Sequence, residues 1–188
     1  MSRIVRHTEL TPVRHAHIHT AIAALYYPLT DFDFDHFLKH FSAMRQMPLR
    51  IEQHAFDTDI FALCFPLESV DLVVVNSQMH YLHQQHCILH EIAHLHLKHT
   101  GIPLRKFVAD DLRTKMGITT QIGYGQGTHF SGTLNPAQEQ EAELFVYYLR
   151  RKIANARRLY ELDTPTSIPE LAVTSKGLDF TRYRIDDD

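Results

Sequence analysis

Residues 89–99 read LHEIAHLHLKH, so four histidines and one glutamate lie within eleven residues. The apolar period around this segment predicts one helix over about 80–99. Ile88, Ile92 and Leu95 would form a stripe along that helix and pack it into the core. We therefore expect the histidines to lie on a central helix of the domain.

The flanking sequence predicts further helices and strands. Two stretches before the central helix have apolar residues at helical spacing, and three stretches between them and the central helix are rich in β-branched and aromatic residues. The expected helices cover about 12–27 and 34–44, and the expected strands cover about 49–56, 59–67 and 70–77. The connection from Pro66 to Ser69 is short enough for an antiparallel hairpin.

The sequence after the central helix is less regular up to about residue 135. Gly101 should stop that helix, and the glycine-rich segment GYGQGTHFSGT at 123–133 is expected to be a loop. Asn135 would cap a last helix that runs to about residue 160, with Gln138 completing a capping box.

Together these elements predict an α+β fold, with helices packed around a small antiparallel sheet. Of the 188 residues, 44% are apolar and 22% are charged, which is enough for one globular domain with a real core. We expect residues 1–160 to form that domain and residues 161–188 to form an irregular C-terminal tail.

Charge and cysteine content restrict the partners and the compartment. The formal net charge is -3, which argues against nucleic acid or an anionic membrane as a partner. Cys64 and Cys87 are too few to staple a domain of this size, and we expect both to be buried thiols. The N-terminus lacks a signal-peptide pattern, and no stretch has the length of a transmembrane helix. These features predict a cytoplasmic protein.

Within the central helix, His90, Glu91 and His94 form the pattern H-E-x-x-H. Residues four apart on a helix share one face, with Cβ atoms about 5–6 Å apart, so the two imidazoles can bind one zinc ion. The intervening glutamate projects beside them, where it can take a proton from water. The pattern therefore predicts a zinc site with Glu91 as general base.

The helix after Asn135 offers a third ligand, because catalytic zinc sites usually combine three protein ligands with one open position. Glu139 and Glu143 share one face of that helix, whereas Glu141 points roughly to the opposite side. A metal would explain an acidic pair beside apolar residues. The alternative is a solvated acidic first turn, which the helix dipole favours.

The segments LHEIAHLHLKHTG and EQEAELFVYYL together resemble the ImmA/IrrE family of zinc metallopeptidases, over roughly residues 15–160. The family's second motif, E-x-x-A-N/D-x-F-A, matches this chain at its glutamate, alanine and phenylalanine, the first of which is Glu139. The resemblance implies a zincin-like fold. It also implies that zinc is held by His90, His94 and Glu139, with Glu91 as the general base.

The chain departs from the family pattern at several positions. Glu143 stands where the family has Asn or Asp, and this longer acid could still orient a zinc ligand. Val146 replaces a small residue, and Gln85, His86 and Cys87 replace an Arg-Phe-Thr-like approach to the first histidine. These departures keep open a second interpretation, a catalytically weak or inactive zinc-binding regulatory protein that acts by docking a partner.

The resemblance also implies a biological role. It predicts a zinc-dependent endopeptidase that cleaves a helix-turn-helix transcriptional repressor and so releases the repressed genes. The partner would be that protein substrate, with no direct contact to nucleic acid or membrane. The chain itself has no helix-turn-helix pattern and no basic patch beyond the 150–158 run, so direct DNA binding is not expected.

Other histidines and one tyrosine are weaker candidates for the site. His86 would lie on the same helical face as the motif histidines and could line the cleft. Tyr124 and His129, in the glycine-rich segment, could contact a tetrahedral intermediate if that segment closes over the site. We expect His96 and His99 at the surface or at the edge of the core.

Overall fold

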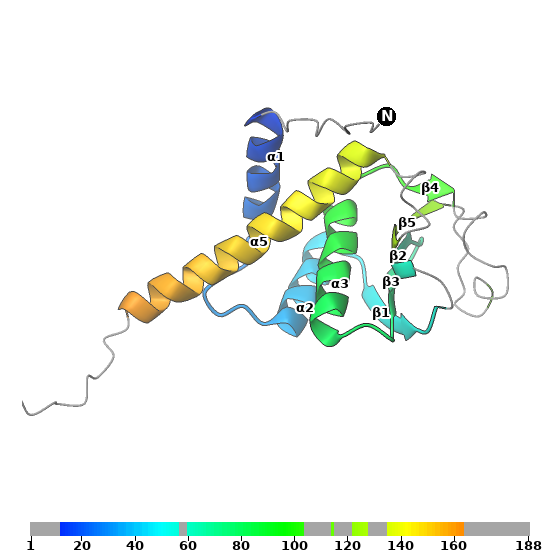
Figure 1. Cartoon of the computed structure of the whole chain (residues 1–188), viewed down its shortest axis with the longest axis horizontal. Coiled ribbons are helices and arrows are strands. Elements are labelled where there is room, and N and C mark those ends of the chain that lie inside the picture. Colours follow the sequence, from blue (N-terminus) through cyan, green and yellow to red (C-terminus); the bar gives the residue numbers. More distant parts are fainter. Residues whose placement is uncertain (1–11, 57–59, 104–113, 115–121, 128–134, 164–188) are drawn as a thin grey trace, which may run out of the picture.

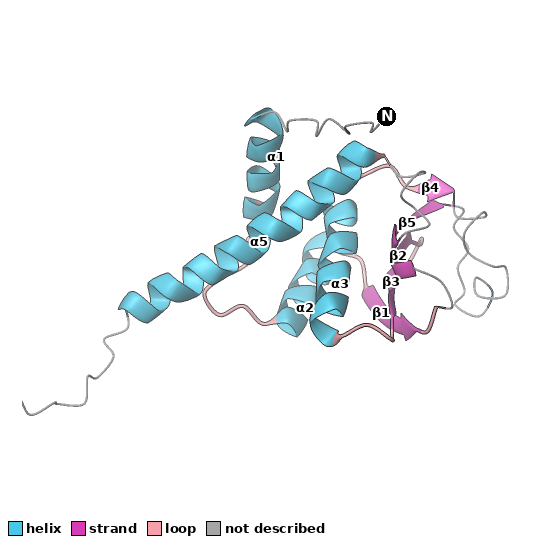
Figure 2. Cartoon of the chain, in the orientation of Figure 1, coloured by secondary structure: helices cyan, strands magenta, loops and turns pink. Residues whose placement is uncertain are grey.

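The computed structural model describes residues 12–56, 60–103, 114, 122–127 and 135–163, and the fold within these ranges is mixed α+β, as predicted (Figures 1 and 2). The helices are α1 (Pro12–Ala23), α2 (Phe34–Arg45), α3 (Tyr81–His96) and α5 (Pro136–Asp163). The strands are β1 (Leu49–His54), β2 (Ile60–Pro66), β3 (Asp71–Asn76), β4 (Ile102–Pro103) and β5 (Ile122–Gly127). The predicted tail at 161–188 lies outside the described residues, apart from the end of α5.

The strands are ordered β1-β3-β2-β5-β4 across the sheet. The predicted hairpin is confirmed, because β2 and β3 pair antiparallel and the Leu67 N–H donates to the Val70 carbonyl at 3.0 Å. The prediction of a purely antiparallel sheet is wrong, because β1 runs parallel to β3, with Ile51 opposite Val73. Every residue of β3 is buried, which suits an inner strand, whereas every residue of β1 is half-buried or exposed, which suits an edge.

Helix α3 lies between the sheet and α5, and α1 packs against α5 (Figure 1). Every residue from Cys87 to Leu95 is buried, which is more than the predicted apolar stripe requires. A helix that is covered on two sides buries most of its circumference. His90, Glu91 and His94 are therefore enclosed as well, with 1%, 0% and 2% of their surfaces exposed.

The buried apolar side chains form one cluster between the helices and the sheet. Its fully buried members include Phe41 of α2, Val73 of β3, Ile92 of α3, and Phe145 and Leu149 of α5. Burial of one such side chain contributes about 1.5–3 kcal/mol, so the cluster holds α5 firmly on α3. This packing brings the acidic start of α5 beside the histidines of α3.

The start of α3 is fixed by a buried amide. Gln84 Nε2 donates to the carbonyl oxygens of Asn76 and Met79, at 3.2 and 3.0 Å. The His80 side chain caps the helix, since its Nδ1 accepts from the Leu82 N–H at 3.3 Å. These bonds hold the short connection between β3 and α3 in place.

Helix α3 ends at His96, before the predicted stop at Gly101. Lys98 takes a left-handed backbone conformation with φ 54°, and the His99 N–H donates to the His94 carbonyl at 3.1 Å. This is a Schellman turn, in which the left-handed position is usually glycine. The turn folds the chain back, so that His99 lies against His94 instead of continuing the helix.

Asn135 caps α5, as predicted, because its Oδ1 accepts from the Ala137 N–H at 3.1 Å. Gln138 does not complete the predicted capping box. Its side-chain amide instead pairs with the backbone of Thr100. The amide oxygen accepts from the Thr100 N–H at 2.8 Å, and the amide nitrogen donates to the Thr100 carbonyl at 3.3 Å.

The second half of α5 projects past α3 and ends at Asp163 (Figure 2). Among the described helices, none combines the length and the apolar character needed to cross a membrane.

Candidate metal centre

The start of α5 crosses α3 and brings the three predicted zinc ligands together. His90 Nε2 lies 3.0 Å from His94 Nε2 and 3.3 Å from Glu139 Oε2. His94 Nε2 lies 3.2 Å from Glu139 Oε1. One metal-binding atom from each residue lies within 4.8 Å of the other two.

These separations fit a tetrahedral metal ion. Ligand atoms that bind zinc at about 2.0–2.1 Å stand about 3.3 Å from one another. The observed separations of 3.0, 3.2 and 3.3 Å are close to that value. Two imidazole nitrogens and one carboxylate oxygen are also a common donor set of catalytic zinc. The residues present therefore fit a zinc ion held by His90, His94 and Glu139.

The charges at the site also favour a cation. Burial opposes ionisation of Glu139, but hydrogen bonds from His90 and His94 outweigh it and lower its pKa to about 2. The pKa of Glu143 is lowered as well, chiefly by His86. Burial lowers the pKa of His94, whereas in His90 the effect of burial is outweighed by Glu139 and Glu143, which raise its pKa. The carboxylates thus attract positive charge to the point where the ligand atoms meet.

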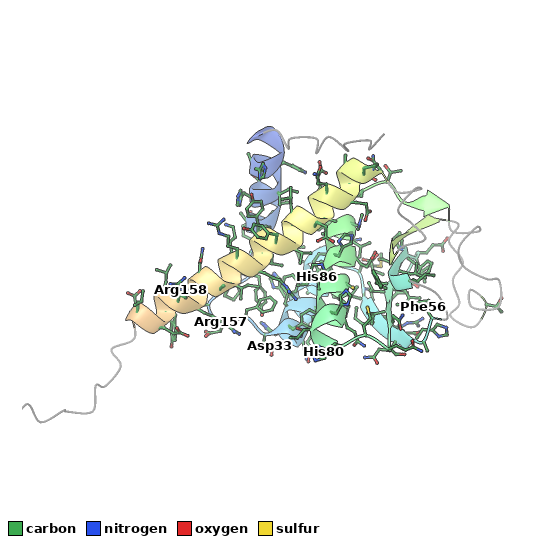
Figure 3. The ribbon with its side chains drawn as sticks, in the orientation of Figure 1. Asp33, Phe56, His80, His86, Arg157 and Arg158 are labelled. Carbon is green, nitrogen blue, oxygen red and sulfur yellow. The ribbon has the colours of Figure 1, made fainter. Side chains whose placement is uncertain are left out.

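Glu143 contacts the other ring nitrogen of His90. Its Oε1 lies 3.0 Å from His90 Nδ1, within ion-pair distance although the direction is poor for a hydrogen bond. Its Oε2 lies 3.5 Å from His86 Nε2. His86 lies on the side of α3 that faces α5 (Figure 3). Glu143 therefore lies beside both His90 and His86, and its role in orienting a ligand stays a prediction.

His99 and Glu141 also meet the site, although the sequence did not place them there. The prediction that His99 lies at the surface or core edge is wrong, because it is buried with its Nδ1 3.0 Å from His94 Nδ1. Glu141 is not one of the three ligands, but its Oε2 lies 3.2 Å from His99 Nε2. Helical spacing could not reveal this contact, because His99 follows the end of α3 and the left-handed Lys98.

Glu91 is enclosed between α3 and the sheet. Neither of its carboxyl oxygens has a hydrogen-bond partner within the part of the chain that the structure describes. Burial raises the pKa of both Cys64 in β2 and Cys87 in α3, and the charge of Glu91 adds to each shift, which places Glu91 near both thiols. Burial raises the pKa of Glu91 itself to about 8, although His90 acts in the opposite direction. An acid with a pKa near neutrality can both accept and return a proton.

The remaining predicted candidates are less well placed or not described. The predicted loop is wrong over residues 123–127, which belong to β5, a strand that pairs with β2; Tyr124 lies there with its backbone opposite Cys64. The Tyr124 side chain is outside the described structure. His129 is also outside the described residues. His96 is half-buried, and its Nε2 makes a 2.8 Å hydrogen bond to the Ala21 carbonyl, which joins α3 to α1. His96 therefore has a structural role at the edge of the core, as expected.

Comparisons of the chain with protein-family models, with curated proteins and with solved structures found no match. The likeness to the ImmA/IrrE family therefore rests on the motif residues and stays a prediction.

Proposed function

We propose that the chain is a zinc-dependent endopeptidase with a zincin-like active site, in which His90, His94 and Glu139 hold zinc and Glu91 is the general base. The observation that carries this proposal is the meeting of three side chains: the two imidazole Nε2 atoms lie 3.0 Å apart, and each lies 3.2 or 3.3 Å from one oxygen of the Glu139 carboxylate. A fully buried carboxyl group directly follows the first ligand in the chain. Buried ionisable groups of this kind gather at functional sites.

Zinc, when bound, would act as a Lewis acid toward the scissile carbonyl and the attacking water. Glu91 would take one proton from that water as the water oxygen attacks the carbonyl carbon. It would return this proton to the leaving nitrogen as the C–N bond breaks. A zinc ion bound beside Glu91 would oppose the effect of burial on its pKa and so favour the carboxylate form that accepts the proton.

We infer that the substrate is a helix-turn-helix transcriptional repressor, cleaved in the cytoplasm. The likeness to the ImmA/IrrE family motivates this inference. A hollow of about 480 Å³ beside the site supports it, lined by His86, Glu143, Val146, Tyr147, Arg150 and Arg151. A hollow of this size accepts a few side chains of an extended segment and not a folded domain. An exposed linker of a repressor would meet that requirement.

A second candidate function is favoured by the enclosure of Glu91. None of its surface is exposed, and neither oxygen has a partner among the described residues. A general base must reach the attacking water. If no water reaches Glu91, the chain would bind zinc without cleaving and would act by docking a partner.

The test is co-expression with helix-turn-helix repressors from the same genome, comparing the wild type with Glu91→Gln. Glutamine keeps the size of the side chain but cannot accept the proton, so cleavage should be lost while zinc content is unchanged. Sequencing of the fragments would give the cleavage site. A repressor that stays intact yet loses DNA binding equally with both proteins would favour the docking function.

A further inference from the structure

A buried chain of side chains connects His94 to a carboxylate on α5. His94 Nδ1 lies 3.0 Å from His99 Nδ1, and His99 Nε2 lies 3.2 Å from Glu141 Oε2. The side chains of His94 and His99 are 2% and 5% exposed, and that of Glu141 is 21% exposed. The chain of contacts therefore runs from the proposed ligand toward the surface, through a region that is largely closed to water.

The chemistry of imidazole fixes the direction of this chain. A neutral imidazole carries hydrogen on one ring nitrogen and a lone pair on the other. If His94 Nε2 binds a metal, Nδ1 carries the hydrogen and needs an acceptor. His99 Nδ1 can accept only when the hydrogen of His99 is on Nε2, where the Glu141 carboxylate accepts it. One arrangement of hydrogens satisfies all three residues.

We propose that His99 and Glu141 are positioning residues for the zinc site. Glu141 holds the hydrogen of His99 on Nε2, and His99 in turn holds the hydrogen of His94 on Nδ1, so that His94 Nε2 presents its lone pair to the metal. The inference rests on the proposed function, because it takes His94 as a zinc ligand. Metal-binding histidines commonly donate their second N–H to a carboxylate or carbonyl group, and here an imidazole extends the reach of the carboxylate.

The backbone holds His99 in this position. Lys98 has φ 54°, a conformation that residues with a Cβ rarely take. The turn lets His99 contact His94 twice, through the ring and through its N–H, which donates to the His94 carbonyl at 3.1 Å. The next residue, Thr100, is paired through its backbone with Gln138 on α5. The segment is thus fixed to both α3 and α5, and the ring of His99 has little freedom to turn away.

If His99 and Glu141 served only to join the turn after α3 to α5, an imidazole and a carboxylate would not be needed. Apolar side chains of the same size could fill that space without burying polar nitrogens. The second imidazole ligand, His90, also has a carboxylate at its Nδ1, since Glu143 Oε1 lies 3.0 Å away. A carboxylate therefore lies beside the second nitrogen of His90, without a hydrogen bond to it among the described residues, and the His99 ring lies beside that of His94.

The test compares variants that keep or remove the acceptor atoms. His99→Phe and Glu141→Ala remove them, whereas His99→Asn and Glu141→Gln keep an acceptor oxygen at the matching place. Zinc affinity, measured by competition with a chelator, should fall about 10–100-fold in the first pair and recover in part in the second. His17→Ala and Glu161→Ala, at exposed positions on α1 and α5, are matched controls that should bind zinc like the wild type.

The outcomes separate this inference from the proposed metal site. If Glu139→Ala also leaves zinc affinity unchanged, the metal site itself is wrong. If Glu139→Ala weakens binding but the His99 and Glu141 variants do not, only the positioning role is wrong. Equal affinities of His99→Phe and His99→Asn would also overturn it. The unfolding free energy of each metal-free variant, measured in parallel, identifies a purely structural effect, which would lower stability without changing the affinity of the folded protein.

A measurement on the wild type avoids any variant that fails to fold. Nitrogen-15 NMR of the zinc-loaded protein, with labelled histidine, reads which ring nitrogen carries hydrogen. We expect hydrogen on Nδ1 of His94 and on Nε2 of His99. Hydrogen on Nδ1 of His99 would overturn the proposal, because that nitrogen could then not accept from His94.

Discussion

Glu91 should lower the stability of the metal-free protein, so replacing it with leucine should raise that stability. The side chain has no exposed surface, and no described residue forms a hydrogen bond with either carboxyl oxygen. An unpartnered buried polar group costs about 1–3 kcal/mol, and leucine would fill a similar volume without that cost. At pH 5, where the buried carboxyl is protonated, we expect Glu91→Leu to raise the unfolding free energy by about 1–3 kcal/mol.

The increase in unfolding free energy caused by Glu91→Leu should become larger as pH rises. Burial raises the folded-state pKa of Glu91 to about 8 from 4.5, so between these values the folded protein holds a proton that the unfolded chain releases. This contribution therefore makes the wild type less stable as pH rises, by up to about 1.4 kcal/mol per pH unit for one proton. Leucine has no proton to release, so the advantage of Glu91→Leu should be larger at pH 7 than at pH 5.

Urea unfolding followed by circular dichroism, in buffer with a chelator, measures both effects. Glu52→Leu is the control, because Glu52 is only half-buried and pairs with Arg50 at 2.9 Å. It should change the unfolding free energy by no more than about 0.5–1 kcal/mol. The reasoning is refuted if Glu91→Leu is less stable than the wild type, or if the difference shrinks as pH rises, since the carboxyl would then be well solvated in the fold.

Other consequences concern the turn after α3, the core and the two thiols. Lys98→Gly should raise the unfolding free energy by about 1 kcal/mol, because glycine adopts φ 54° without strain from a Cβ; a loss of stability would contradict the turn. Phe145→Ala should lower that free energy by about 3–5 kcal/mol, because the ring is fully buried, and a loss below about 1 kcal/mol would contradict the packing of α5 on α3. Cys64 and Cys87 are free and buried, as the sequence predicts, and burial raises the pKa of Cys87 to about 12. Both should resist a thiol reagent at pH 8 until the protein unfolds, and rapid labelling of either in the folded state would contradict their burial.

The pairing of His90 with His94 could be predicted because residues four apart share a helical face at any position in a protein. The hairpin between β2 and β3 is likewise local, since the connection from Pro66 to Ser69 permits little else. These features depend on residues that are close in sequence, and the structure agrees with them. Glu139 is distant in sequence from both histidines, and its choice over Glu143 came from the resemblance to the ImmA/IrrE motif.

The features that the sequence did not reveal depend on distant contacts or on unusual backbone conformation. The parallel pairing of Ile51 with Val73 depends on which strand takes the middle of the sheet, a choice made by burial on both faces. His99 reaches His94 because Lys98 takes the left-handed conformation that glycine usually occupies. No helical or strand period extends through such a turn, so the contact of His99 with Glu141 could not be predicted.

The most direct test of the proposed zinc site is the zinc content of the purified chain, measured by plasma mass spectrometry after saturation with zinc and removal of excess. We expect about one zinc per chain in the wild type and in the Glu161→Ala control, as three protein ligands around one ion require. Glu139→Ala should retain little zinc, because it removes the carboxylate that lies 3.2 and 3.3 Å from the two imidazoles. A wild-type chain without bound zinc, or a Glu139→Ala variant that retains as much as the wild type, would contradict the site.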